Sequence, residues 1–316
     1  PAPGWDGSHD WTGWVPFDAM PHAENPDSGV LVNANNRVQA PGAEPYLGRD
    51  WFGDWRFQRI QALLAERSLH APQDLAAMQR DELSLFARQM LPVLRAMPRP
   101  DGPAGAARDL LLGWDGGMQT NIPQPLIFNA WWPEFARMAM DAGGVPPGAR
   151  GPGAEFVRFV LRPDGAGRHW CGGAGCEAMA VEALQRAVAA LSDRFGADPA
   201  AWRWGAAHVA RFEHPLLRAL PVLGNLATIA VPTSGDGETV NRGGLRADFA
   251  HVHGAGLRLV ADLSTPDGLM AIIGTGQSGH PLSPHWADLN PGWAAGRMIP
   301  LGRGAERRGR LSLRPE

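Results

Sequence analysis

One short apolar run stands out in the first fifty residues. Residues 30–32 are all apolar, and proline and glycine lie just before them, as is typical of the start of a buried strand. We therefore expect a strand over residues 28–34. Carboxamides cluster at its far end, at Asn33, Asn35 and Asn36. Such side chains donate uncharged N–H groups, which suits an oxyanion that develops in acyl transfer, although a polar turn that ends a strand has the same composition.

Helical periodicity dominates the middle of the chain. Leu75, Met78 and Phe86 share one face of a helix that Pro72 opens, because residues at such intervals stack along an α-helix. Similar patterns recur before and after this segment. The expected helices span residues 54–67, 72–94, 104–113, 123–141 and 177–195.

Short apolar runs replace the helical pattern from residue 226 onward. They predict strands at 226–232, 255–263 and 268–274, since runs of this length between turn residues suit a sheet. The segment 143–153 is rich in glycine and proline and is expected to be a loop. We interpret residues 1–316 as a single domain, helix-rich over 54–196 and strand-rich over 226–300, with 143–153 as the alternative place for a linker.

Composition narrows the classes of function. The formal charge is −3, and all 29 basic residues are arginine. A weakly acidic chain argues against nucleic acid as a partner, and the absence of lysine excludes lysine chemistry. No apolar run is long enough to cross a membrane.

A set of motifs in a fixed order carries the strongest functional signal. The motifs are Asp10-Trp-Thr-Gly-Trp-Val-Pro-Phe-Asp18, Trp51-Phe-Gly-Asp-Trp-Arg-Phe-Gln-Arg-Ile60, Gly113-Trp-Asp-Gly116, Trp202-Arg-Trp-Gly-Ala-Ala-His208, His214-Pro215, Gly235-Asp-Gly-Glu-Thr-Val240 and Thr275-Gly-Gln-Ser-Gly-His-Pro-Leu-Ser-Pro-His-Trp286. Together with the carboxamide segment, they closely resemble the catalytic chain of the penicillin acylase family, the N-terminal-nucleophile amidohydrolases. The match begins well inside that chain, so this sequence is similar to its C-terminal part.

The resemblance implies a fold, a reaction and partners. The fold would be α/β, the four-layer αββα sandwich of N-terminal-nucleophile hydrolases, of which this chain supplies part. The reaction would be hydrolysis of an N-acyl amide, of penicillin or acyl-homoserine lactone type, through an acyl-enzyme on an N-terminal serine. Residue 1 here is proline, so the serine would lie outside this chain. The partners would be the N-terminal part of the catalytic chain and the smaller α chain, and the location periplasmic or extracellular.

Two alternatives accompany that interpretation. The chain could be a non-catalytic or truncated homologue that only binds an acyl ligand or a partner. Ser8, in Gly7-Ser8, looks like a processing junction that could expose a new nucleophile. We do not favour Ser8, because the Asp-Trp motif that follows lies far downstream of the family's nucleophile.

The resemblance also assigns roles to particular residues. Asn35 matches the family asparagine whose side-chain N–H stabilises the oxyanion, with Asn33 and Asn36 as alternatives in register. Arg56 matches an arginine that orients that asparagine, and Arg59 is its nearest competitor. No cofactor is required. A structural Ca²⁺ is a further expectation, with Glu44 as a loosely matched ligand, because carboxylate oxygens suit this ion.

The two cysteines, Cys171 and Cys176, are separated by a flexible Gly-Gly-Ala-Gly spacer. This spacing favours a disulfide, which fits an exported protein. A metal site that adds His169 is the alternative, but it lacks a fourth ligand and the usual zinc spacing.

Three further features have modest interpretations. Residues 274–279 satisfy G-x-G-x-x-G, but prolines follow where a dinucleotide site needs a helix, so we expect a tight turn. His251 and His253 could bind a metal, but we expect them to be partly buried hydrogen-bonding groups. Five tryptophans could line an acyl pocket, although core packing is expected for most of them: Trp5, Trp11, Trp14, Trp51 and Trp55.

Overall fold

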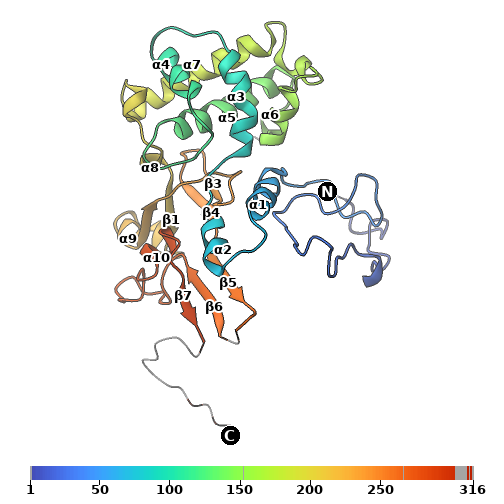
Figure 1. Cartoon of the computed structure of the whole chain (residues 1–316). Helices are drawn as coiled ribbons and strands as arrows, with labels where there is room; N and C mark the ends of the chain where they lie inside the picture. The colour runs from blue at the N-terminus through green and yellow to red at the C-terminus, as the bar shows by residue number, and fades with distance from the viewer. Residues whose placement is uncertain (1, 152, 266, 303–311, 313, 315–316) are drawn as a thin grey trace.

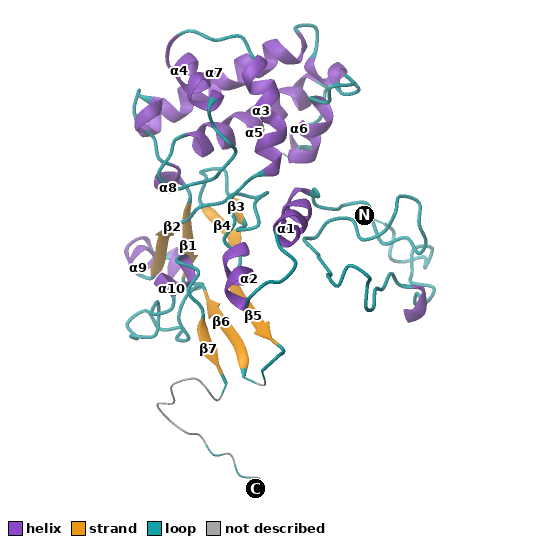
Figure 2. Ribbon diagram, in the orientation of Figure 1, coloured by secondary structure: helices purple, strands orange, loops and turns teal. Residues whose placement is uncertain are grey.

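The chain separates into a helical end and a strand-rich end, with a long irregular segment beside them. The structure is a computed structural model that describes residues 2–151, 153–265, 267–302, 312 and 314. Helices α3 to α7 gather at one end, and the strands lie at the other (Figure 1). The segment before α1 extends to one side of both (Figure 2).

The helices follow the predicted pattern closely, except over residues 72–94. The expected helices at 54–67, 104–113, 123–141 and 177–195 are all confirmed, with ends displaced by a few residues at most. The helices are α1 (Trp55–Ala65), α2 (Pro72–Met78), α3 (Leu85–Ala96), α4 (Gly102–Leu112), α5 (Gln124–Ala142), α6 (Ala154–Val160), α7 (Gly175–Phe195), α8 (Trp204–Ala207), α9 (Pro221–Leu226) and α10 (Asn290–Ala294).

The single helix predicted over residues 72–94 is wrong, because the chain forms α2 and α3 with a break between them. Ser84 ends the break: its hydroxyl accepts a hydrogen bond from the backbone N–H of Ala87 (3.2 Å), which caps α3. Leu83 pairs with Gly117 as an isolated bridge. The cap at Ser84 is local, whereas the pairing of Leu83 with Gly117 joins segments distant in sequence, so a local cap and a tertiary contact together interrupt the helical periodicity here.

Apolar faces of α3 to α7 form the main core. Phe86, Phe128, Trp131 and Phe135 are all fully buried within it. Trp131 on α5 also donates its indole N–H to the carbonyl of Ala180 on α7 (3.1 Å), so a buried polar atom is satisfied while two helices are joined. This core is the scaffold against which the strand-rich end packs.

Two small sheets make up the strand-rich end. One is mixed, in the order β2-β1-β4-β3, with β1 parallel to β4 and antiparallel to β2. The other is antiparallel, in the order β5-β6-β7. The predicted strands at 226–232, 255–263 and 268–274 correspond to β2, β5 and β6. The strands are β1 (Val209–Glu213), β2 (Thr228–Pro232), β3 (Gly243–Leu245), β4 (His251–Gly254), β5 (Leu257–Asp262), β6 (Gly268–Ile273) and β7 (Ile299–Leu301).

A second, smaller core joins the two sheets. Ala210 on β1, Ile272 on β6 and Trp293 on α10 are all buried there. Residues 274–279 follow β6 as an irregular segment with bends, and α10 begins only at Asn290. The G-x-G-x-x-G sequence therefore does not open a helix.

The strand predicted over residues 28–34 is wrong. This segment is irregular, and the side chains of Val30 and Leu31 are 43% and 67% exposed. A strand is stable only when a neighbour accepts and donates its backbone hydrogen bonds. No strand among the described residues pairs with this segment, so local apolar character alone does not produce one.

Most of the N-terminal tryptophans are also on the surface. Trp5, Trp11 and Trp14 are 87–90% exposed, so the expectation of core packing is wrong for these three. Trp55 is buried against Phe86, with ring centroids 4.9 Å apart. Among the helices that the structure describes, none is long and apolar enough to cross a lipid bilayer.

Candidate functional site

Asn35 lies at a strained turn of the irregular N-terminal segment. Its φ is +63°, a left-handed conformation that asparagine tolerates better than most residues. The carboxamide oxygen of Asn33 accepts a hydrogen bond from the backbone N–H of Asn35 (2.9 Å), which holds the turn locally. The side chain of Asn35 is exposed, so this turn presents its carboxamide to solvent.

Arg56, in the first turn of α1, holds the oxygen end of that carboxamide. Its guanidinium Nη2 donates to Asn35 Oδ1 over 3.3 Å, and the arginine is only 7% exposed. Arginine has donors and no acceptor, so the atom that faces it must be the oxygen. The NH₂ end of Asn35 therefore remains free to donate elsewhere.

Asn36 and Arg59, the alternatives to Asn35 and Arg56, make different contacts from the predicted pair. Asn36 is 8% exposed, and both ends of its amide are occupied: Oδ1 accepts from the N–H of Ala34, and Nδ2 donates to the carbonyl of Arg37. Arg59 makes a two-pronged ion pair with Asp81, at 2.9 and 2.6 Å. Asn36 and Arg59 are thus committed to local structure, whereas Asn35 and Arg56 contact each other.

Acidic and basic groups also lie near Arg56, which interacts electrostatically with Arg242 and Glu238. Arg56 and Arg242 both lie over the ring of Phe52, each 5.5 Å from its centroid. Burial and, to a smaller extent, the neighbouring Asp236 raise the pKa of Glu238 to about 7, although Arg56 and Arg242 oppose the rise. Burial likewise raises the pKa of Asp236 to about 6. This charged cluster, defined as Arg56, Asp236, Glu238 and Arg242, therefore contains two carboxyl groups that titrate near neutrality.

Three members of the charged cluster, Asp236, Glu238 and Arg242, line a cavity of about 970 Å³, whereas Arg56 and Asn35 are not among its lining residues. Phe86, Trp132 and Phe249 supply apolar walls, while Glu238 and Arg242 supply charge. An apolar cavity with a few converging polar groups is the usual form of a small-molecule site. Sequence reasoning assigned no role to Asp236 or Glu238, although both lie in the motif Gly235-Asp-Gly-Glu238.

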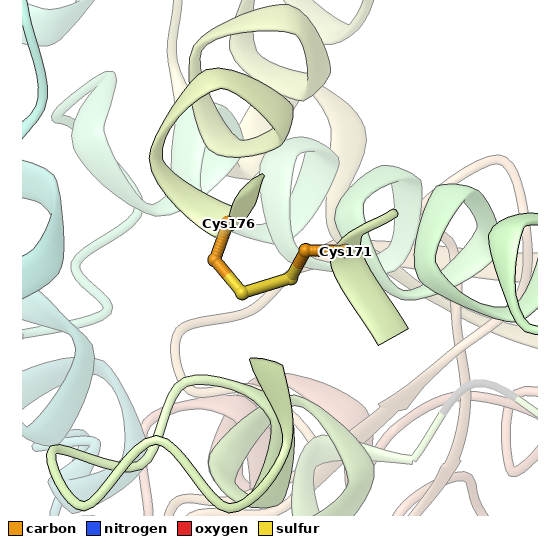
Figure 3. The surroundings of a disulfide bond; sticks show 2 residues. All are labelled: Cys171 and Cys176. Atoms are coloured by element: carbon orange, nitrogen blue, oxygen red, sulfur yellow. A yellow bond between two sulfur atoms is a disulfide. The ribbon is translucent and has the colours of Figure 1, made fainter. Parts of the chain in front are cut away.

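The disulfide prediction is confirmed. Cys171 and Cys176 are bonded to each other at the start of α7 (Figure 3). Because both sulfurs are used, the alternative metal site with His169 is wrong. Glu44 is exposed, and the described residues contain no group of three or more His, Cys, Asp or Glu arranged to hold a metal. The calcium ion remains a prediction.

The histidines act as hydrogen-bonding and stacking groups. His251 shares a hydrogen bond with Thr233 Oγ1 (2.9 Å), and His253 with Arg242 (2.8 Å). The ring of His208 stacks on His251, with centroids 5.1 Å apart. Burial lowers the pKa of His208 to about 3 and that of His251 to about 4, so both rings are neutral at physiological pH. They therefore form a packed, uncharged link between the sheets and the helical end.

Ser8 lies in the exposed N-terminal segment. Its hydroxyl contacts Asp6 Oδ1 and His9 Nδ1, both at 2.7 Å. In a nucleophilic triad the acid orients the histidine, and the histidine activates the serine. Here acid and histidine both contact the serine within one turn, and Ser8 does not line the cavity. The arrangement is a local hydrogen-bonded turn.

Comparison with known proteins identifies the family. A sequence model described as penicillin amidase matches residues 1–308. The chain belongs to the penicillin amidase family. It is 34% identical over 320 residues to the penicillin acylase 2 proenzyme of Pseudomonas sp. (strain SE83), across 95% of this chain and 40% of that protein. It is 27% identical over 343 residues to the acyl-homoserine lactone acylase QuiP of Pseudomonas aeruginosa, again across 95% and 40%.

The structural comparison agrees with this assignment. The thermostable penicillin G acylase from Alcaligenes faecalis superposes with a TM-score of 0.64 and 22% identity, over 98% of this chain and 62% of that one. This likeness confirms the predicted mixed α/β fold class of the N-terminal-nucleophile hydrolases. This chain spans about 40% of the length of the curated relatives that it matches.

Proposed function

We propose that this chain is part of an amidohydrolase that cleaves an N-acyl amide, with Asn35 as an oxyanion-stabilising donor and Arg56 as the residue that orients it. The observation that carries the proposal is the hydrogen bond from Arg56 Nη2 to Asn35 Oδ1. Family membership supports the reaction class, since the matched relatives bear the names penicillin acylase and acyl-homoserine lactone acylase.

The chemistry depends on which end of Asn35 is free. In acyl transfer, the carbonyl oxygen of the substrate gains negative charge as the tetrahedral intermediate forms. A rigidly held N–H donor stabilises that charge without having to reorganise during the reaction. Arg56 fixes the oxygen end of the carboxamide, and the turn at Asn33 fixes the backbone. The NH₂ group of Asn35 is thus held ready for the oxyanion.

The nucleophile in this proposal is a serine at the N-terminus of a segment outside this chain. The serine hydroxyl attacks the amide carbon and its proton passes to the free α-amine; the resulting ammonium gives that proton to the amide nitrogen, so that the C–N bond breaks and the amine product leaves as the acyl-enzyme forms. Water then releases the acid. The partners are therefore the remainder of the catalytic chain and a smaller α chain.

The substrate and location follow from the same reasoning. The substrate is a penicillin-type or acyl-homoserine lactone amide, the two classes that the relatives' names contain. The site is periplasmic or extracellular, a placement that the disulfide between Cys171 and Cys176 supports, because such bonds persist in oxidising compartments. A structural Ca²⁺ near Glu44 belongs to the proposal as well.

Hydrolysis of an acyl anilide tests the proposal. The chain joined to its N-terminal serine segment and α chain should release the amine, and this chain alone should not. Replacing Asn35 by alanine should lower kcat about 10²–10³-fold with little change in KM, because the donor acts on the transition state. Robust hydrolysis by this chain alone would contradict the placement of the nucleophile. Full activity of Asn35→Ala would contradict the oxyanion role.

A further inference from the structure

A second cavity, about 490 Å³ in volume, contains a buried cation with no acidic partner. Arg258 on β5 lines this cavity and is only 7% exposed. The strand's alternation turns the leucines at 257 and 259 outward, 55% and 44% exposed, and places Arg258 on the inner face beside Val260. Two leucines at the surface and an arginine inside reverse the usual preference, which indicates a specific use for the charge.

The contacts of Arg258 are all to uncharged groups. Nη1 donates to the carbonyl of Gln79 (2.8 Å) and Nη2 to Asn241 Oδ1 (2.7 Å), while Nε has no partner among the described residues. The guanidinium lies 5.6 Å from the ring centroid of Trp293. No described carboxylate lies within ion-pair distance. Burying a cation without an anion is costly, so this arrangement lacks a counter-charge.

The rest of the lining adds to the positive charge and supplies polar contacts. Burial lowers the pKa of Arg258, and repulsion from Arg80, which is exposed and lines the same cavity, lowers it further. Glu82 is the only carboxylate among the described lining residues. Since His251 is neutral, two guanidiniums and one carboxylate leave a single net positive charge. Uncharged hydrogen-bonding side chains complete the wall, namely Gln119, Thr120, Asn121, Thr233, Ser234 and Asn241.

We propose that this cavity binds an organic monocarboxylate, which Arg258 and Arg80 recognise together. A single negative charge matches the net charge of the lining, and guanidinium–carboxylate pairs form strong, directional hydrogen bonds. The remaining N–H groups of the two guanidiniums and the polar wall supply donors, and Pro232 and Ala294 supply a small apolar surface for the remainder of the molecule. The site differs from the 970 Å³ cavity, since Asn241 and Ser234 face one cavity while Glu238 and Arg242 face the other.

Saturation-transfer NMR with propionate, and with its neutral isostere propionamide, tests the proposal on the intact chain. Propionate should bind and propionamide should not. Because Arg80 is exposed, Arg80→Gln should leave folding unchanged, and it should weaken propionate binding about tenfold, since a hydrogen bond to a charged group is lost. Glu82→Gln should tighten binding about threefold, because it removes a like charge. Arg162→Gln, which removes an equal charge from an exposed ion pair elsewhere, is the matched control and should have no effect.

Three outcomes would overturn the proposal. One is the absence of propionate binding to the unmodified chain. Another is equal binding of propionate and propionamide, since charge would then play no part. The third is that neither Arg80→Gln nor Glu82→Gln changes the affinity for propionate, as is expected of Arg162→Gln, because the anion would then bind elsewhere.

The carboxylate could come from a free molecule or from an acidic side chain of a segment outside this chain, and a second arm separates these sources. The same titration is repeated on the protein assembled with the remaining segments of the proposed enzyme. Binding that persists there shows that the occupant is a free molecule, whereas loss of binding on assembly shows that a side chain fills the cavity. The result does not depend on hydrolytic activity, so it can fail while the proposed function stands.

Discussion

Glu238 should make the stability of the protein fall as pH rises, and Glu238→Gln should remove much of that fall. The side chain is partly buried, and its Oε2 has no hydrogen-bond partner among the described residues. Burial, reinforced by Asp236, raises the pKa from the usual 4.5 to about 7 despite Arg56 and Arg242. That rise corresponds to about 3 kcal/mol between the two protonation states.

The direction follows from proton binding. Between pH 4.5 and about 7 the folded protein keeps the Glu238 proton, while the unfolded chain has lost it. The folded state thus binds more protons, and the free energy of unfolding decreases as pH rises through this window. Above pH 7 the full cost of an ionised, buried carboxylate is present. Glutamine has nearly the same shape and no charge, so the variant avoids this cost.

Urea unfolding at the two ends of the window measures the effect. Relative to the unmodified chain, Glu238→Gln should gain about 3 kcal/mol in the free energy of unfolding as pH increases from 4.5 to above 7. Asp236, whose pKa is also raised, leaves a residual slope in both proteins. Parallel stability profiles for the two proteins would refute the account of the charged cluster.

Two further predictions concern the scaffold. Trp131→Ala should cost about 3–5 kcal/mol in the free energy of unfolding, because it empties a fully buried site and removes the hydrogen bond to Ala180. The control Trp14→Ala, at a 90% exposed position, should change the free energy of unfolding by less than about 0.5 kcal/mol. Equal losses for the two variants in denaturant titrations would contradict the assignment of Trp131 to the core. Replacing Cys171 and Cys176 together by alanine should cost roughly 2 kcal/mol, since the bond closes only a short loop; calorimetry that shows no change in Tm would count against a stabilising role for the bond.

The sequence predicted the helical end far better than the N-terminal segment. Helices such as α5 and α7 carry long, regular apolar faces, so local pattern and packing agree there. The apolar run at residues 30–32 has the composition of a strand, but no described neighbour pairs with it. The break between α2 and α3 depends on the cap at Ser84 and on contact with Gly117. The cap is a local signal, but the contact with Gly117 is distant in sequence and cannot be read from local periodicity.

The candidate site was predicted in part. Resemblance to the family pointed to Asn35 and Arg56, which contact each other, and their roles stay a prediction. The same reasoning gave no role to Asp236, Glu238 or Arg258. Their unusual character arises from burial and from neighbours that are distant in sequence. A sequence shows that a carboxylate or a guanidinium is present, but its environment exists only in the folded chain.

The central claim is that Arg56 acts by orienting Asn35, and a double-mutant cycle on kcat of the assembled enzyme tests it most directly. Arg56→Lys keeps the charge but loses the guanidinium geometry, and Arg59→Lys is the matched control at a residue that pairs with Asp81. We predict that Arg56→Lys lowers kcat when Asn35 is present and has no further effect on Asn35→Ala, because coupled residues are not additive. An equal fold-loss from Arg56→Lys in both backgrounds would contradict the claim.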